Sequence, residues 1–276
     1  MSRHVMECLG LSRVTIEDGK VVEVTEPRVK YCPLFAQKRG IQELNKDTIK
    51  ENIEYRMRTF GMCCENRETE MDNFLSFGVS ELLCLALKNK KIEAAVIAAD
   101  GCGTAVISNP CIVQGMGGRI SGICETEPIP KVIEAIGPEN VVDPDTAKID
   151  MIEGVCKAYD KGLHKVAVTT TSVQDAWMMR DMFGTDLIII GVHTSGMTEK
   201  DAADAFELFD IITACASKPL REIYHRNPEK YLAAGNKVPV YGITEQGKEL
   251  IMDKLKELGK QPYDGSIPEE PPSPLI

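Results

Sequence analysis

Short apolar runs alternate with helical segments over more than half of this chain. The runs are IEAAVIAA (92–99), KVAVTTT (165–171), DLIIIGVH (186–193), IITACAS (211–217) and VPVYGIT (238–244). Unbroken apolar strands separated by helices are typical of parallel strands that are buried on both faces. The pattern predicts an α/β fold with a mainly parallel, doubly wound sheet and helices on both faces. A closed barrel is disfavoured because too few β/α units are present.

A smaller unit precedes this domain. Polar and apolar residues alternate on both sides of Asp18-Gly19 in SRVTIEDGKVVEVTEP, and this dipeptide suits a tight hairpin turn. We expect a small β-hairpin here, followed by a helix over 47–61 that ends near Gly61. The predicted organisation is an N-terminal hairpin and helix region at 1–62, an α/β domain at 63–260, and an extended tail at 261–276 that is rich in proline and acid.

The net charge of −10 restricts the partners that we expect. Nucleic-acid backbones and anionic membrane surfaces are bound by clustered Lys and Arg, so neither is expected here. The apolar runs are far shorter than the roughly 20 residues of a membrane span, and the first residues show no apolar signal core. We therefore expect a soluble, cytoplasmic protein that binds small molecules or other proteins.

Polar residues follow the predicted strands, at the place where α/β sheets bind their ligands. In open sheets of this kind, the site lies outside the carboxyl ends of the strands. A glycine-rich loop at 114–122 carries the guanidinium of Arg119, and its glycines leave backbone N–H groups free to approach an anion. The candidate ligand-binding residues are Asp100, Gly101, Gly103, Gly117, Gly118, Arg119, His193, Ser195 and Lys218.

Several polar positions also have structural interpretations. Ser172 and Thr198 stand where helix N-caps belong. His193 could be a hydrogen-bonded structural histidine, and Lys218 could simply be exposed beside Pro219. The glycine-rich loop is neither G-x-G-x-x-G nor a Walker loop, so it is a weak signal for a nucleotide.

Ten cysteines occur without any C-x-x-C pair. In a reducing cytosol they are free thiols, metal ligands or redox groups rather than a disulfide framework. Cys84, Cys156 and Cys215 lie in apolar runs or on a helical stripe and are expected in the core. Thiols on loops stay accessible, so the candidate ligands of a metal or an iron–sulfur cluster are Cys32, Cys63, Cys64, Cys102, Cys111 and Cys124. The alternative is that these thiols are buried or idle.

Four stretches together resemble the methanogenesis marker protein 8 family of methanogenic archaea. They are EDGKVVEVTEPRVKYCPLF, MCCENR, AADGCGTAV and NPCIVQGMGGRISGICETEPIP, and the resemblance extends from the hairpin to about residue 260. It implies a protein that works with other proteins of methanogenesis on the assembly, modification or reductive activation of methyl-coenzyme M reductase. It assigns no catalytic residue.

Three functions follow as hypotheses. The first is an accessory protein in the maturation or reductive activation of methyl-coenzyme M reductase, with a metal or iron–sulfur site on the loop cysteines. The second is an enzyme that acts on a small anionic ligand at the carboxyl edge of the sheet. Its binding or acid–base groups would be Asp100, Arg119, His193 and Lys218. The third is a non-catalytic scaffold whose acidic surface and tail bind partners.

Overall fold

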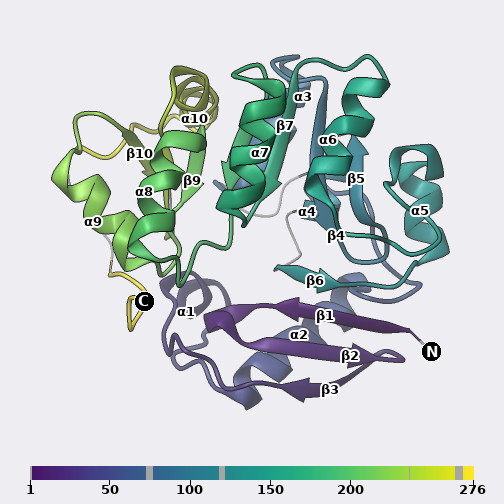
Figure 1. The fold of residues 1–276 in the computed structure, drawn as a ribbon. Helices are drawn as coiled ribbons and strands as arrows, with labels where there is room; N and C mark the ends of the chain where they lie inside the picture. Colours follow the sequence, from purple (N-terminus) through teal and green to yellow (C-terminus); the bar gives the residue numbers. More distant parts are fainter. Residues whose placement is uncertain (1, 73–76, 118–121, 236, 265–269) are drawn as a thin grey trace.

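Two β-sheets with covering helices form the computed structural model, which describes residues 2–72, 77–117, 122–235, 237–264 and 270–276. The fold is α/β, as the sequence predicts. Figure 1 shows the smaller sheet, built largely from the N-terminal segment, below the larger sheet. Strand β6 lies at the junction between the two.

The smaller sheet is antiparallel throughout its described strands. In the order β3-β2-β1-β6, its strands are β1 (Arg3–Glu7), β2 (Arg13–Glu17), β3 (Lys20–Val24) and β6 (Ile123–Glu125). β2 and β3 pair around Asp18 and Gly19, which both have the positive φ that a tight two-residue turn requires. The N-terminal unit is therefore larger than the hairpin that we expected, because β6 reaches it from far along the chain.

One helix packs against the smaller sheet, and the two together form a hydrophobic core. α2 (Lys46–Phe60) begins at the N-cap Asn45 and ends at Gly61 in the left-handed conformation, close to the predicted 47–61. Its Ile49 and Ile53 are fully buried against Val14 and other apolar residues of the sheet. The short helix α1 (Pro33–Arg39) and a 3-10 turn at Leu9–Leu11 complete this unit.

The larger sheet is mixed. In the order β10-β11-β9-β8-β7-β4-β5, its described strands are β4 (Ala94–Ala99), β5 (Gly103–Ile107), β7 (Val166–Thr170), β8 (Ile188–Gly191), β9 (Ile211–Thr213), β10 (Leu232–Gly235) and β11 (Pro239–Gly242). The four central strands β4, β7, β8 and β9 are parallel, whereas β5, β10 and β11 join antiparallel at the two edges.

The expectation of a mainly parallel, doubly wound sheet is not confirmed. The parallel strands follow one another in chain order without a reversal, and antiparallel strands extend both edges. Continuous apolar runs indicate that a strand is buried on both faces, but they do not indicate whether the neighbouring strands are parallel or antiparallel. The runs therefore located the central strands without fixing their topology.

Helices cover both faces of the larger sheet, as expected. One face carries α6 (Met151–Asp160), α7 (Val173–Phe183), α8 (Glu199–Leu208) and α9 (Lys218–Arg226). The other carries α3 (Val79–Lys88), α4 (Pro110–Gly117), α5 (Pro130–Ile136) and α10 (Glu245–Glu257), and a 3-10 turn lies at Pro138–Asn140. No helix in the described part of the chain is long and apolar enough to cross a membrane.

The segment between β4 and β6 is more regular than its glycines suggested. We expected loops here, but β5, α4 and β6 occupy most of it. β5 pairs directly with β4 through a tight connection at Asp100–Cys102. The sequence LAAG likewise forms a strand, β10, although alanine and glycine are not typical of strands. In both cases, pairing with a neighbouring strand overrides a local pattern that was ambiguous.

Candidate functional site

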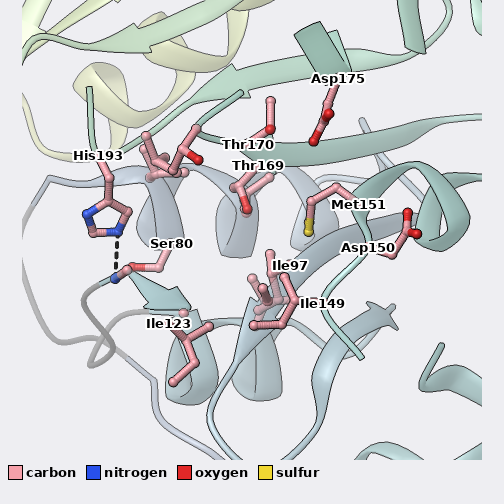
Figure 2. Close-up of a pocket in the computed structure, with 18 of the residues that line it drawn as sticks. Ser80, Ile97, Ile123, Ile149, Asp150, Met151, Thr169, Thr170, Asp175 and His193 are labelled. Atoms are coloured by element: carbon pink, nitrogen blue, oxygen red, sulfur yellow. Dashed lines mark hydrogen bonds between the residues drawn. The ribbon is translucent and has the colours of Figure 1, made fainter. Parts of the chain in front are cut away.

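A pocket of about 450 Å³ lies at the carboxyl ends of the central strands. It opens beside the last residues of β4 and β7 and the residues that follow β8. This is the edge at which the sequence places a ligand site. Figure 2 shows the lining side chains, which come from both the larger sheet and β6 of the smaller sheet.

One wall of the pocket is apolar. Ile97 of β4, Ile123 of β6 and Ile149, which precedes α6, line this wall together with Met151. Val79 and Leu83 of α3 and Val113 of α4 extend the apolar surface. An apolar body of a ligand would be desolvated against this wall.

The opposite side of the pocket is polar. Thr169 and Thr170 end β7, Thr171 follows it, and all three line the pocket. Asp175 enters from the first turn of α7. Ser172 caps α7, since its Oγ accepts a hydrogen bond of 3.0 Å from the Asp175 N–H. A few polar groups beside an apolar wall are the usual composition of a small-molecule site.

A second carboxylate lines the pocket at the start of α6. Asp150 is the N-cap of this helix and accepts a hydrogen bond of 2.9 Å from the Glu153 N–H. Its other oxygen lies 3.0 Å from the Lys148 Nζ. Asp150 shares this cation, which lies outside the pocket lining, with Glu153, whose carboxylate is 2.5 Å from the same Nζ.

His193, a residue that the sequence predicts for the site, lines the pocket two residues after the end of β8. Its Nε2 accepts a hydrogen bond of 3.0 Å from the Gly122 N–H, so the proton of the neutral ring is on Nδ1 (Figure 2). Desolvation, assisted by the charge of Arg56, lowers the pKa of His193 to about 4. The imidazole is therefore neutral at pH 7, although the residue as a whole is exposed. Its backbone φ of 52° is in the left-handed region, which His tolerates better than most residues.

Asp100 has a different role from the one that we expected. It is fully buried, and its carboxylate lies 3.0 Å from the Nε of the equally buried Arg67. It also accepts a hydrogen bond of 2.7 Å from the Cys63 N–H. A carboxylate with these partners holds two chain segments together and is outside the pocket lining. Arg67 has no local signal in the sequence, because its partner lies 33 residues away.

The glycines of the first candidate loop shape a turn. Gly101 and Gly103 both have positive φ, and a Cβ on Gly103 would lie 2.1 Å from the Ala147 carbonyl oxygen. The Gly101 N–H donates to Thr126 Oγ1 at 2.8 Å and is therefore not free for a ligand. Of the second loop, Gly117 lines the pocket at the end of α4. Gly118 and Arg119 lie outside the described residues.

Two further candidates are not part of the pocket lining. Ser195 Oγ accepts a hydrogen bond of 3.1 Å from the Ala216 N–H and joins the loops after β8 and β9. Lys218 begins α9 with an exposed side chain whose Nζ lies 3.8 Å from Glu222. Of the predicted ligand-binding residues that the structure describes, His193 and Gly117 come together in the pocket.

The six candidate cysteines do not assemble one metal site. Two of them, Cys63 and Cys102, are buried beside Asp100, and burial raises the pKa of the Cys102 thiol to about 12. Cys111 is in α4 with its Sγ 3.6 Å from Asp72, and Cys124 is in β6, so neither lies on a loop. The remaining two are Cys32, which precedes α1, and Cys64.

A resident metal or cluster on these thiols does not fit this arrangement. Within the described ranges, no group of three or more His, Cys, Asp or Glu side chains could hold a metal ion. Burial also disfavours the thiolate form that a metal requires, as the raised pKa of the buried Cys63 shows. We expected an accessible ligand set because spacing alone gave no information on which thiols are buried.

The pocket also contains residues that we did not single out from the sequence. Asp150, Asp175 and Thr169 belong to this group, as does Ile123. The run of threonines at 169–171 was a usable signal, because it ends a predicted strand. Asp175 could have been found as the acid three residues after the predicted cap Ser172.

The fold and the pocket define an α/β protein with a ligand-sized cavity at the carboxyl edge of its central strands. The chain belongs to the archaeal family described as "Uncharacterized protein conserved in archaea (DUF2099)", whose model matches residues 4–256. It is similar to the "Uncharacterized protein MJ0054" of Methanocaldococcus jannaschii, with 45% identity over 265 residues that cover 94% of this chain and 93% of the relative. No solved structure matches the chain.

Proposed function

We propose that this protein binds a small amphipathic molecule in the pocket at the carboxyl edge of the larger sheet. The observation that carries this proposal is the cavity of about 450 Å³, with one apolar wall and one polar side. Small-molecule sites have volumes of about 300–1,000 Å³ and the same combination of surfaces. The apolar part of the ligand would contact Ile97, Ile123 and Ile149, and its polar end would face the threonines of β7 and Asp175.

Binding is better supported than catalysis. The ring nitrogen of His193 that could act as a base already accepts a hydrogen bond from the Gly122 backbone, not from a hydroxyl nucleophile. Asp100 and Lys218, which we expected as partners of His193, are engaged elsewhere. An enzyme that acts on a small anionic ligand therefore receives less support from the described residues than a binding protein does.

The role in methanogenesis remains a prediction. The resemblance to the methanogenesis marker protein 8 family supports an accessory role in the maturation or reductive activation of methyl-coenzyme M reductase. A bound small molecule is compatible with such a role. The cytoplasmic location, the interaction with other proteins of methanogenesis, and the exclusion of nucleic acid and membrane as partners also remain predictions.

The proposal is tested with a neutral amphipathic probe, phenethyl alcohol. Saturation-transfer NMR on the full chain should detect binding to the wild type, and binding should be lost in Ile149→Trp, whose indole fills the pocket. Val22→Trp is the matched control, because Val22 is an exposed residue of β3 outside the pocket. Failure of the wild type to bind, or equal binding by a folded Ile149→Trp protein, would show that the pocket is not the site.

A further inference from the structure

We propose that the pocket selects ligands that carry an ammonium group and that the Asp175 carboxylate binds this group. This inference rests on the proposed function, because it names the class of ligand that the same pocket takes. Four observations support it. Asp175 lines the pocket, its carboxylate does not cap its own helix, the described lining is negatively charged, and the opposite wall is apolar.

Asp175 is placed at the pocket by the start of α7. It is the third residue of this helix, and Figure 2 shows its carboxylate pointing toward Met151 across the pocket. An acid at this helix position commonly accepts a hydrogen bond from the N-cap N–H. Here the Ser172 N–H donates instead to Thr170 Oγ1 at 3.0 Å. The carboxylate of Asp175 is therefore not used to cap its own helix.

The charge of the lining favours a cation. Among the described lining residues there is no Lys or Arg. Asp150 is paired with Lys148, which it shares with Glu153, and His193 is neutral at pH 7. No hydrogen bond or ion pair from another described residue reaches the Asp175 carboxylate. The described lining is thus net negative, and Asp175 is its carboxylate without a paired cation.

A half-buried carboxylate that faces an apolar wall across the pocket discriminates between ligands by their charge. Its hydrogen bond to an ammonium group is charge-assisted and is about twice as strong as one between neutral groups. A carboxylate on the ligand would instead be repelled, and the low local dielectric increases that cost. The Thr169 hydroxyl, on the same side of the pocket, can accept a second ammonium N–H. An amine attached to an apolar body matches both sides of the cavity.

The test compares three probes that share a phenyl body and differ in the polar group: phenethylamine, phenethyl alcohol and hydrocinnamate. Affinities for the full chain at pH 7 are measured by NMR titration. We expect phenethylamine to bind about tenfold more tightly than phenethyl alcohol, as expected for a hydrogen bond to a charged group. Hydrocinnamate should bind most weakly of the three.

Two matched variants locate the effect. In Asp175→Asn, the ratio of amine to alcohol affinity should fall to near one. Asp181→Asn removes the same charge from an exposed position of α7, and the tenfold ratio should persist in it. If the ratio of amine to alcohol affinity fell in both variants, the preference for the amine would come from the overall negative charge of α7. The assignment to Asp175 would then be wrong.

The wild-type ranking is decisive even where Asp175→Asn does not fold. If the amine and alcohol bind equally, or if hydrocinnamate binds most tightly, the inference is wrong while the proposed function stands. If no probe binds, the proposed function fails and the inference fails with it.

Discussion

At the scale of single residues, the buried pair of Arg67 and Asp100 connects the N-terminal segment to the edge of the larger sheet. Both side chains are fully buried, and the Arg67 guanidinium also donates to the Gly115 carbonyl oxygen at 3.2 Å. A buried pair gains little over an apolar replacement, but removal of one partner leaves an uncompensated charge. The loss of stability on substitution therefore depends on whether one charged side chain of the pair stays buried without its partner.

We predict that Arg67→Ala lowers the free energy of unfolding by about 3–5 kcal/mol, because the Asp100 charge stays buried without its partner. Urea denaturation measures this change. Lys200→Ala, which removes one side of an exposed ion pair with Asp204, should cost less than about 1 kcal/mol. Similar costs for the two variants would show that the buried pair carries no special penalty.

His193 leads to a second prediction, on pH. Its pKa is about 4 in the folded protein, whereas an unfolded histidine titrates near pH 6.5. Below pH 6.5 the unfolded chain therefore binds a proton that the folded chain does not, and stability is lost as the pH falls from 6.5 toward 4. His4, whose pKa is also lowered by burial, acts in the same direction.

The check is the free energy of unfolding at pH 7 and pH 5 in the wild type and in His193→Asn. Asn tolerates the positive φ at this position. The loss of stability between the two pH values should be smaller in the variant than in the wild type. Equal losses would mean that His193 does not contribute to the pH dependence.

The sequence predicted single residues well where their role is local. Ser172 and Thr198 are N-caps as predicted. Their hydroxyl oxygens accept hydrogen bonds from the backbone N–H groups of Asp175 and Asp201. His193 was located because it ends a predicted strand. The pairing of Arg67 with Asp100 could not be predicted, because nothing in either local pattern specifies a contact between distant segments.

At the scale of elements, packing decides what local propensity leaves open. Gly154 lies inside α6, where alanine would normally stabilise the helix by about 1 kcal/mol. A Cβ at this position would come within 2.6 Å of side-chain carbons of Val96 and Thr104 on the sheet. Real Cβ atoms do not approach so closely, so α6 must move away or the sheet side chains must shift.

We predict that Gly154→Ala destabilises the protein by about 1 kcal/mol, since an overpacking cost of about 1–3 kcal/mol exceeds the gain in helix propensity. Combining it with Val96→Ala should give a double variant that loses less stability than the sum of the two single changes, because the smaller side chain makes room. Urea denaturation of the four proteins measures the coupling. Additive losses would contradict the packing explanation.

The elements that the sequence missed share one physical cause. β5 and β10 are short, and each is held by a neighbouring antiparallel strand. Their sequences, GTAVI and LAAG, carry glycine and alanine, which are not typical of strands. The central strands were recognised because burial on both faces gives them long apolar runs.

At the scale of the whole molecule, the two sheets are connected at several places. β6 pairs with β1, which lies far away in the sequence. Beside this pairing, the Glu7 N–H donates to the Gly122 carbonyl oxygen at 2.8 Å, although the two residues are 115 positions apart. The tail adds a further link, since Ser273 pairs with Tyr31 and the Ile276 N–H donates to the Ala216 carbonyl oxygen at 2.9 Å. The pocket lies where the two sheets meet, so its β6 side could not be predicted from either segment alone.

These connections predict that the two sheets unfold in one cooperative transition. Native-state hydrogen exchange as a function of urea tests this for the amides of Val5 and Val14 in the smaller sheet and of Val168 and Ile189 in the larger one. All four should converge on the same free energy of opening, because separating the sheets would break β6 from β1 and expose the Arg67–Asp100 pair. Amides of the edge strand β3 are excluded from the comparison because edges open locally. If Val5 and Val14 exchange through an opening of lower free energy, the smaller sheet is an independent folding unit, and the pocket would lose its β6 wall before the larger sheet unfolds.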